Sequence, residues 1–182
     1  GGSAGSAARG VRENGEYDYG WKAEVEPEVR ETMRAAGRGR LEIAYGTQTE
    51  RINLNWTNPD PARGAKRSTK EAGPHPALKD PAVRRALSLA IDRDIIVEAG
   101  YGKSGKPTCN IVPAPEAVAS TKNDSWCLKQ DLEAANKLLD DAGWVKGGDG
   151  IRAKDGVKLD FLYSTSTNSV RQATQELVKS MW

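Results

Sequence analysis

The stretch at residues 75–102 most constrains the fold of this chain, because it reads as two short helices joined at an acid. Asp80 is a suitable N-cap, and Pro81 suits the first helical position, where no backbone N–H is needed. Apolar residues three and four apart then form one stripe, at Val83, Ala86, Leu87, Ala90 and Ile91. Asp92 can cap the second helix, which Gly100 ends. The stretch therefore predicts two amphipathic helices packed on a core.

Similar signals predict the other elements of the chain. Further helices are expected at residues 6–14, 27–36 and 131–142, and a last one opened by Thr165 or Ser169. Alternating apolar residues predict strands, which are expected at residues 17–22, 41–45, 51–56 and 157–163. The second and third strands are expected to form an antiparallel hairpin, and Asp155-Gly156 to close another. The fold class expected is α/β, with a mixed sheet of about four strands flanked by helices that include residues 81–91 and 131–142.

Length and charge narrow the classes of protein that remain. The chain has 182 residues, enough for a single domain over residues 1–182 with a sizeable core. Its net charge of +2 comes from 27 basic and 25 acidic residues, and Phe occurs once, so the sequence does not favour nucleic acid as a partner. No apolar run reaches the length needed to cross a bilayer, so we expect attachment to a membrane to be peripheral, without insertion.

Two segments look irregular. Residues 1–5 are rich in Gly and read as a linker, a disordered end or a cloning remnant, although the layout after Ser3 favours native sequence from there. Residues 57–77 hold several prolines and basic residues with no hydrophobic period, and we expect them to form a mobile loop.

Two sequence motifs carry a resemblance to a known family. Residues 80–102, DPAVRRALSLAIDRDIIVEAGYG, contain V-R-x-A-L, then A-I-D-R, then I-V. Residues 131–144, DLEAANKLLDDAGW, form an acid-capped helix that ends in L-L-x-x-A-G. Together they resemble the signatures of family 5 extracellular solute-binding proteins, the receptors of peptide, dipeptide and nickel ABC importers. A generic amphipathic helix pair is the alternative for the first motif alone.

The resemblance implies both an architecture and a role. It covers nearly the whole chain but only the middle of the family, so the chain would be one lobe, often called domain III, of a two-lobed periplasmic-binding-protein type II fold. The full-length receptor closes on an oligopeptide or similar small solute and delivers it to an ABC permease, with no cofactor. It would be periplasmic or extracellular, in some cases anchored as a lipoprotein. The chain has no signal peptide, so it would be an excised or mature-chain fragment.

The resemblance also singles out candidate ligand-binding residues. In the family the strand after G-E-x-D, here in GEYDYGW, ends at the cleft between the lobes. Tyr19 and Trp21 are therefore expected to contact ligand, since aromatic rings offer sequence-tolerant apolar contact with a polar handle. Gln48, near the turn of the first hairpin, is a weaker candidate. Alternation alone would instead place both aromatic residues in the core.

The two cysteines are the other candidate pair. An even cysteine count in a protein that matures outside the cytoplasm predicts a disulfide between Cys109 and Cys127. Two unpaired thiols are the alternative, and two cysteines with one distant histidine are a poor metal-ligand set.

The sequence does not favour an enzyme. His75 is the single histidine, so a catalytic triad that contains a histidine could be formed only with this residue. It lies among prolines and reads as a solvated loop residue. No nucleophile with a nearby base stands out, and the acids around Asp149 lack the spacing of a calcium loop. The remaining alternative to a solute receptor is a protein-interaction module that binds no small molecule.

Overall fold

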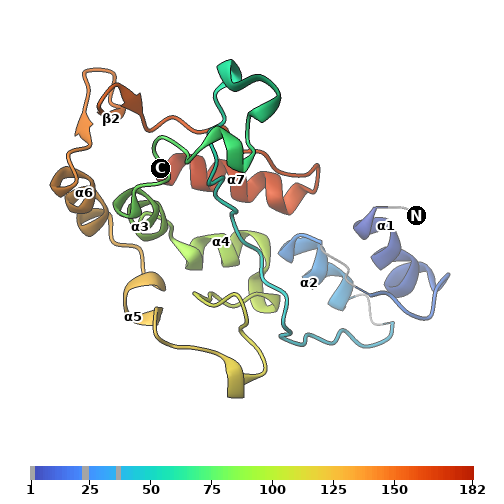
Figure 1. The fold of residues 1–182 in the computed structure, drawn as a ribbon. Helices are drawn as coiled ribbons and strands as arrows, with labels where there is room; N and C mark the ends of the chain where they lie inside the picture. The colour runs from blue at the N-terminus through green and yellow to red at the C-terminus, as the bar shows by residue number, and fades with distance from the viewer. Residues whose placement is uncertain (1–2, 22–24, 36–37) are drawn as a thin grey trace.

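The computed structural model describes residues 3–21, 25–35 and 38–182. Helices joined by long extended segments make up most of it, and a small sheet lies at one end (Figure 1). The α-helices are α1 (Ala4–Arg9), α2 (Pro27–Ala35), α3 (Pro81–Leu89), α4 (Arg93–Gly100), α5 (Asp124–Cys127), α6 (Leu132–Asp141) and α7 (Ser169–Met181). One π-helical segment, η1 (Gly10–Asn14), continues α1. The short 3-10 helices are η2 (Pro61–Lys66), η3 (Lys70–Ala72), η4 (Gly102–Ser104) and η5 (Glu116–Val118).

Helices α3 and α6 pack together and hold the main apolar clusters. Trp144, which follows α6, is 2% exposed and packs against Val83 of α3. Its indole Nε1 donates to Asp80 Oδ2 at 2.9 Å, while Asp80 Oδ1 accepts from the backbone N–H of Ala82. One carboxylate therefore caps α3, as predicted, and also orients the largest core side chain.

The other predicted caps of this half are mostly confirmed. Asp92 Oδ1 accepts from Ile95 N at 3.1 Å, and Asp131 Oδ1 accepts from Ala134 N at 2.8 Å. The cap of α7 is different from the prediction: Asn168, and neither Thr165 nor Ser169, accepts from the backbone of the first turn. Several residues before α7 can cap a helix, so the local sequence did not select among them.

The sheet is smaller than predicted. In the described part of the chain it has three antiparallel strands in sequence order, β1 (Val145–Lys146), β2 (Arg152–Lys154) and β3 (Val157–Lys158). Asp155 and Gly156 close the β2–β3 turn with φ of 51° and 77°, which confirms that hairpin. The strand predicted over residues 157–163 is paired only at its start, and no parallel pair makes the sheet mixed.

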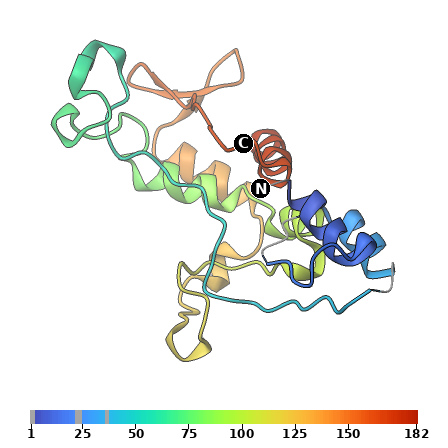
Figure 2. The same cartoon turned by 90° about the vertical axis from the view of Figure 1, so that its right-hand side faces the viewer.

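Residues 38–56 correct the predicted first hairpin. They run as an extended segment away from α2, past α4 and then α7, with no strand arrow along them (Figures 1 and 2). In the described structure residues 41–45 and 51–56 do not pair with each other, and residues 17–21 form no strand either. Side-chain alternation survives, since Ile43, Ile52 and Leu54 are half-buried between exposed neighbours. Alternation reports a buried face, whereas a strand also needs a backbone partner at its edge.

The N-terminal elements form a separate small cluster around Ala8, Val25 and Met33. Arg12 of η1 is buried and donates from Nη2 to the carbonyls of Met33 and Arg34, close to the end of α2. It thereby satisfies carbonyls that a helix end leaves without partners. The predicted helix at residues 6–14 is thus present as α1 and η1, and Ser3 caps it. Gly1, Gly2, Lys22 and Ala36, which belong to predicted elements, lie outside the described residues.

Residues 57–77, predicted to be a mobile loop, contain η2, η3 and a bridge between Thr57 and Pro74. The interpretation of His75 as a solvated residue is wrong. Its ring is half-buried beside Phe161, and its Nδ1 accepts from the backbone N–H groups of Ala77 and Leu78, each at 3.1 Å. This segment has no hydrophobic period because its backbone is held by turns and side-chain caps.

Candidate functional site

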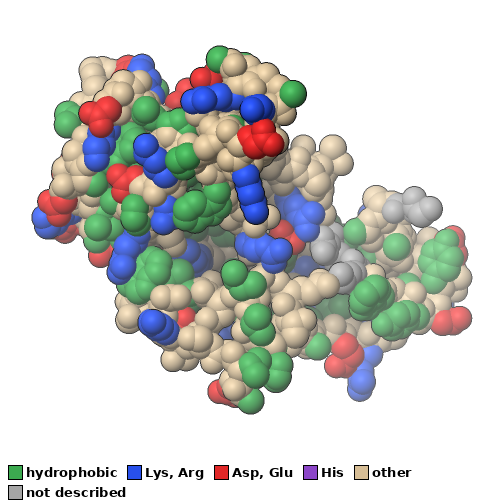
Figure 3. All heavy atoms as spheres, in the orientation of Figure 1, with side chains coloured by type: hydrophobic (Ala, Val, Ile, Leu, Met, Phe, Trp, Pro, Cys, Tyr) green, Lys and Arg blue, Asp and Glu red, His purple; other side chains and the backbone are tan. Residues whose placement is uncertain are grey.

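The aromatic stretch from Tyr17 to Trp21 is the most exposed set of large apolar side chains near the N-terminus. Tyr19 is 78% exposed and Trp21 is 74% exposed, so neither ring lies in the core. Hydrophobic side chains lie open to solvent over the N-terminal elements in Figure 3. The exposure leaves these rings accessible to a ligand or partner, whereas burial had been the alternative on alternation alone.

Glycines fold this stretch back over η1. The backbone N–H groups of Glu16 and Tyr17 both donate to the carbonyl of Gly10. A Cβ added at Gly10 would lie 2.5 Å from Tyr17 Cδ2, so only glycine allows the ring to lie this close. Gly15 takes φ of 70° and turns the chain at the end of η1. These two glycines therefore let Tyr17 pack against η1, and the side chains of Tyr19 and Trp21 that follow are exposed.

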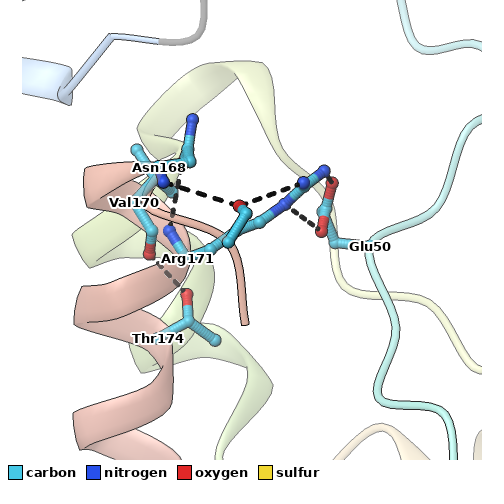
Figure 4. Close-up of polar contacts among 6 residues, drawn as sticks. Glu50, Asn168, Val170, Arg171 and Thr174 are labelled. Carbon is cyan, nitrogen blue, oxygen red and sulfur yellow. Dashed lines mark hydrogen bonds and ion pairs between the residues drawn. The ribbon is translucent and has the colours of Figure 1, made fainter. Parts of the chain in front are cut away.

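Gln48 lies on the extended segment and is exposed. Two residues later, Glu50 accepts two hydrogen bonds from Arg171 of α7, at 3.1 Å from Nε and 2.6 Å from Nη2 (Figure 4). Asn168 Oδ1 accepts from the backbone N–H of Arg171 and thereby caps the N-terminus of α7 next to this ion pair. The ion pair places Gln48 near the N-terminal end of α7. Gln48 and the two aromatic candidates come from separate segments of the chain.

The sequence interpretation missed a hollow of about 370 Å³ beside His75. Its described lining comes from the loop before α3 and from the end of the sheet: Asn58, Pro59, Asp60, Pro61, His75, Pro76, Val157, Lys158 and Asp160. Burial lowers the pKa of His75, and its Nδ1 already accepts two backbone bonds. The imidazole is therefore neutral with its proton on Nε2, which suits a structural cap. Within the described ranges no group of three His, Cys, Asp or Glu side chains is arranged to hold a metal ion.

Cys109 and Cys127 form a disulfide, as predicted. Cys127 is buried at the end of α5, and Arg85 of α3 lies over the neighbouring Trp126 ring at 4.4 Å. The bond thus ties the irregular segment after α4 to the surface of α3.

In the portion of the chain that the structure describes, no helix has the length and apolar character needed to traverse a bilayer.

Comparison with known proteins identifies the family. A family model described as "Bacterial extracellular solute-binding proteins, family 5 Middle" matches residues 3–182. Protein XP55 of Streptomyces lividans is 38% identical over 99 residues, which are 51% of this chain and 17% of that protein. Oligopeptide-binding protein AppA of Bacillus subtilis is 33% identical over 106 residues, covering 52% of this chain and 18% of that protein. Oligopeptide-binding protein OppA of Lactococcus lactis is 31% identical over 100 residues, covering 53% and 16%.

The chain thus spans less than a fifth of the length of these curated relatives. No solved structure matches it. The family match, however, extends over the helices, the sheet and the aromatic stretch alike. The chain therefore belongs to the bacterial extracellular solute-binding proteins of family 5, in their middle region.

Proposed function

We propose that this chain is one lobe of the solute-binding component of an ABC importer, with oligopeptides as the solute. The family is a binding-protein family, and relatives are named as oligopeptide-binding proteins. The complete receptor would have a second lobe and would work outside the cytoplasm, with or without a lipid anchor. It would perform no chemical step and would hand its solute to an ABC permease.

The observation that carries this proposal is the exposure of Tyr19 and Trp21 within the family match. Their rings can cover apolar side chains of many peptides, because such contact depends little on sequence. Gln48 would add a polar contact from the extended segment. Closure of a second lobe over these residues would remove ligand surface from water on both sides, which is where most of the binding energy of an enclosed ligand arises.

Calorimetry with short peptides tests the proposal in the full-length receptor. Trp21→Ala should weaken peptide binding by about tenfold or more, as expected for a buried aromatic anchor. Trp56→Ala is the matched control, because Trp56 is also exposed and lies on the extended segment under Arg84. Equal effects of the two substitutions would reject the assigned role of Trp21.

An interaction module is the second candidate function, and the same exposed aromatic stretch supports it. A module would bind one protein partner and ignore short peptides of unrelated sequence. Saturable binding of several unrelated peptides by the full-length receptor separates the two functions.

A further inference from the structure

A second hollow, of about 410 Å³, lies away from the aromatic stretch, between α2, α4, η4 and the extended segment. Its volume falls in the range of about 300–1,000 Å³ that is typical of small-ligand sites. The described residues that line it are Pro27, Arg30, Glu31, Ile43, Glu98, Gly102 and Lys103. Tyr19, Trp21 and Gln48 are not among them. The hollow therefore lies apart from the residues assigned to peptide binding above.

At the floor of this hollow, η4 packs closely against the start of α2. Gly102 has φ of 51°, and a Cβ added there would lie 3.3 Å from Pro27 Cβ. Glycine thus lets η4 approach the first turn of α2. Beyond Gly102, the hydroxyl of Tyr45 donates to the carbonyl of Lys103 at 2.8 Å and holds the extended segment over the same edge. Pro27 and Ile43 supply half-buried apolar walls.

Arg30 brings a buried charge to the floor. Its residue is 9% exposed, and its two terminal nitrogens donate to the carbonyls of Tyr101, at 2.6 Å, and Val25, at 2.9 Å. No carboxylate within the described structure forms an ion pair with it, and burial lowers its pKa. The nearby charge of Glu31 offsets the cost of burying this guanidinium only in part, so an anionic group in the hollow would stabilise it further.

The rim carries both signs of charge. Glu31 Oε2 lies 3.8 Å from Arg34 Nε, so this carboxylate already pairs with a cation on its own helix. Glu98, near the end of α4, and Lys103, in η4, are exposed, and within the described ranges neither forms an ion pair, with the other or with a third residue. A hollow with unpaired charges of opposite sign above apolar walls is complementary to a small molecule that carries both charges.

We propose that this hollow binds a free aliphatic α-amino acid, with its carboxylate at Lys103, its ammonium at Glu98 and its side chain between Pro27 and Ile43. Arg30 adds positive charge beneath the carboxylate. The ligand would neutralise both rim charges at once, whereas a simple anion or cation would leave one of them unpaired. The rim side chains of Glu98 and Lys103 are exposed and must be ordered when the ligand binds, so we expect a dissociation constant on the order of 1 mM.

Titration of the 15N-labelled 182-residue chain with L-leucine tests this proposal by NMR. Leucine should shift the amide signals of Gly102 and Lys103 saturably. Leucine methyl ester lacks the carboxylate and N-acetylleucine lacks the ammonium, so each should bind about tenfold more weakly. Lys103→Met should abolish the preference for leucine over the ester, and Glu98→Gln should abolish the preference over the N-acetyl compound.

Matched controls are Lys146→Met on β1 and Glu116→Gln in η5, which lie outside the lining residues and should retain both preferences. Equal binding of all three compounds would overturn the proposal. So would the absence of a saturable shift at the solubility limit of leucine, or a loss of preference in the controls. None of these outcomes bears on peptide binding at Trp21, because peptide binding is measured on the full-length receptor and at a different surface.

Discussion

Residues 75–182 and residues 3–56 carry similar sequence patterns but meet their backbone hydrogen-bonding needs differently. In the first region, capped helices and a tight hairpin pair nearby groups, and α3 packs on α6 around Trp144. In the second, the extended stretch makes no backbone–backbone bond between residues 41 and 55 among those the structure describes. The exposed aromatic residues Tyr17, Tyr19, Trp21, Tyr45 and Trp56 also lie there.

The two regions should therefore differ in stability as well as in form. Buried apolar area and paired backbone groups favour the folded state, while an extended segment held by few side chains opens at little cost. Such a segment is also a ready edge for pairing with another strand. Substitutions in the two regions should therefore have unequal effects.

Among these substitutions, Trp144→Ala should lower the free energy of unfolding most. It removes a ring that is 2% exposed and leaves Asp80 without its indole donor, so the free energy of unfolding should fall by about 3–5 kcal/mol. Trp21→Ala, in the other region, should change it by about 0.5 kcal/mol or less, because the ring is exposed. Urea denaturation followed by circular dichroism measures both. Similar losses for the two tryptophans would refute the contrast.

The disulfide should have the next largest effect. It closes a sequence separation of 18 residues, and in the chain-entropy model such a loop is worth about 3 kcal/mol. Replacing both Cys109 and Cys127 by Ser should lower the free energy of unfolding by that amount. Mass spectrometry of unreduced protein provides the control, since two alkylatable thiols in native material would contradict the bond itself.

His75 should make the stability of the helical region depend on pH. Its folded pKa is lowered by burial, so the folded state holds fewer protons than the unfolded state. Stability is then full above the unfolded pKa of about 6.5 and is lost as pH falls through the folded pKa. His75→Ala should cost about 1–2 kcal/mol at pH 7.5, because two backbone N–H groups lose their acceptor.

Denaturation of both proteins between pH 7.5 and pH 5 would isolate this histidine, which is the single one in the chain. The difference between the wild type and His75→Ala should shrink as pH falls. A constant difference would show that Nδ1 is not the acceptor.

The sequence predicted the helices well because each helix closes its own hydrogen bonds. Asp80, Asp92 and Asp131 are caps whose signal lies within three residues of the group they bind. The Asp155-Gly156 hairpin was predictable for the same reason, since positive φ at both positions selects such residues. The extended segments were not, because whether alternating residues form a strand depends on a partner that local sequence does not name.

The features of the candidate site also differ in whether local sequence could predict them. Exposure of Trp21 was foreseen only through the family resemblance, since alternation favoured the core. The two hollows were missed, because each is lined by residues that are distant in sequence, such as Pro27, Ile43 and Lys103. One local signal was available for His75: it stands just before a turn whose first N–H groups need an acceptor.

A small effect on global stability is also expected at the ion pair that joins the two regions. Glu50 and Arg171 are 46% and 41% exposed, so Arg171→Met should lower the free energy of unfolding by about 1 kcal/mol or less. Its local effect should be clearer, because the extended segment depends on few such contacts. Trypsin should cut after the exposed Arg51 up to about fivefold faster in the variant, since about 1 kcal/mol corresponds to that change in the open population.

Lys179→Met provides a matched control for this measurement, because Lys179 also lies on α7 and pairs at 3.9 Å with Glu176 of the same helix. That substitution removes an exposed ion pair without touching residues 38–56, so cleavage after Arg51 should keep its wild-type rate. Raising the salt concentration should reduce the difference between wild type and Arg171→Met, since exposed pairs are screened. If Lys179→Met accelerates the cut equally, or salt has no influence, the extended segment is held by its half-buried side chains Ile43, Ile52 and Leu54 and the ion pair does not hold it.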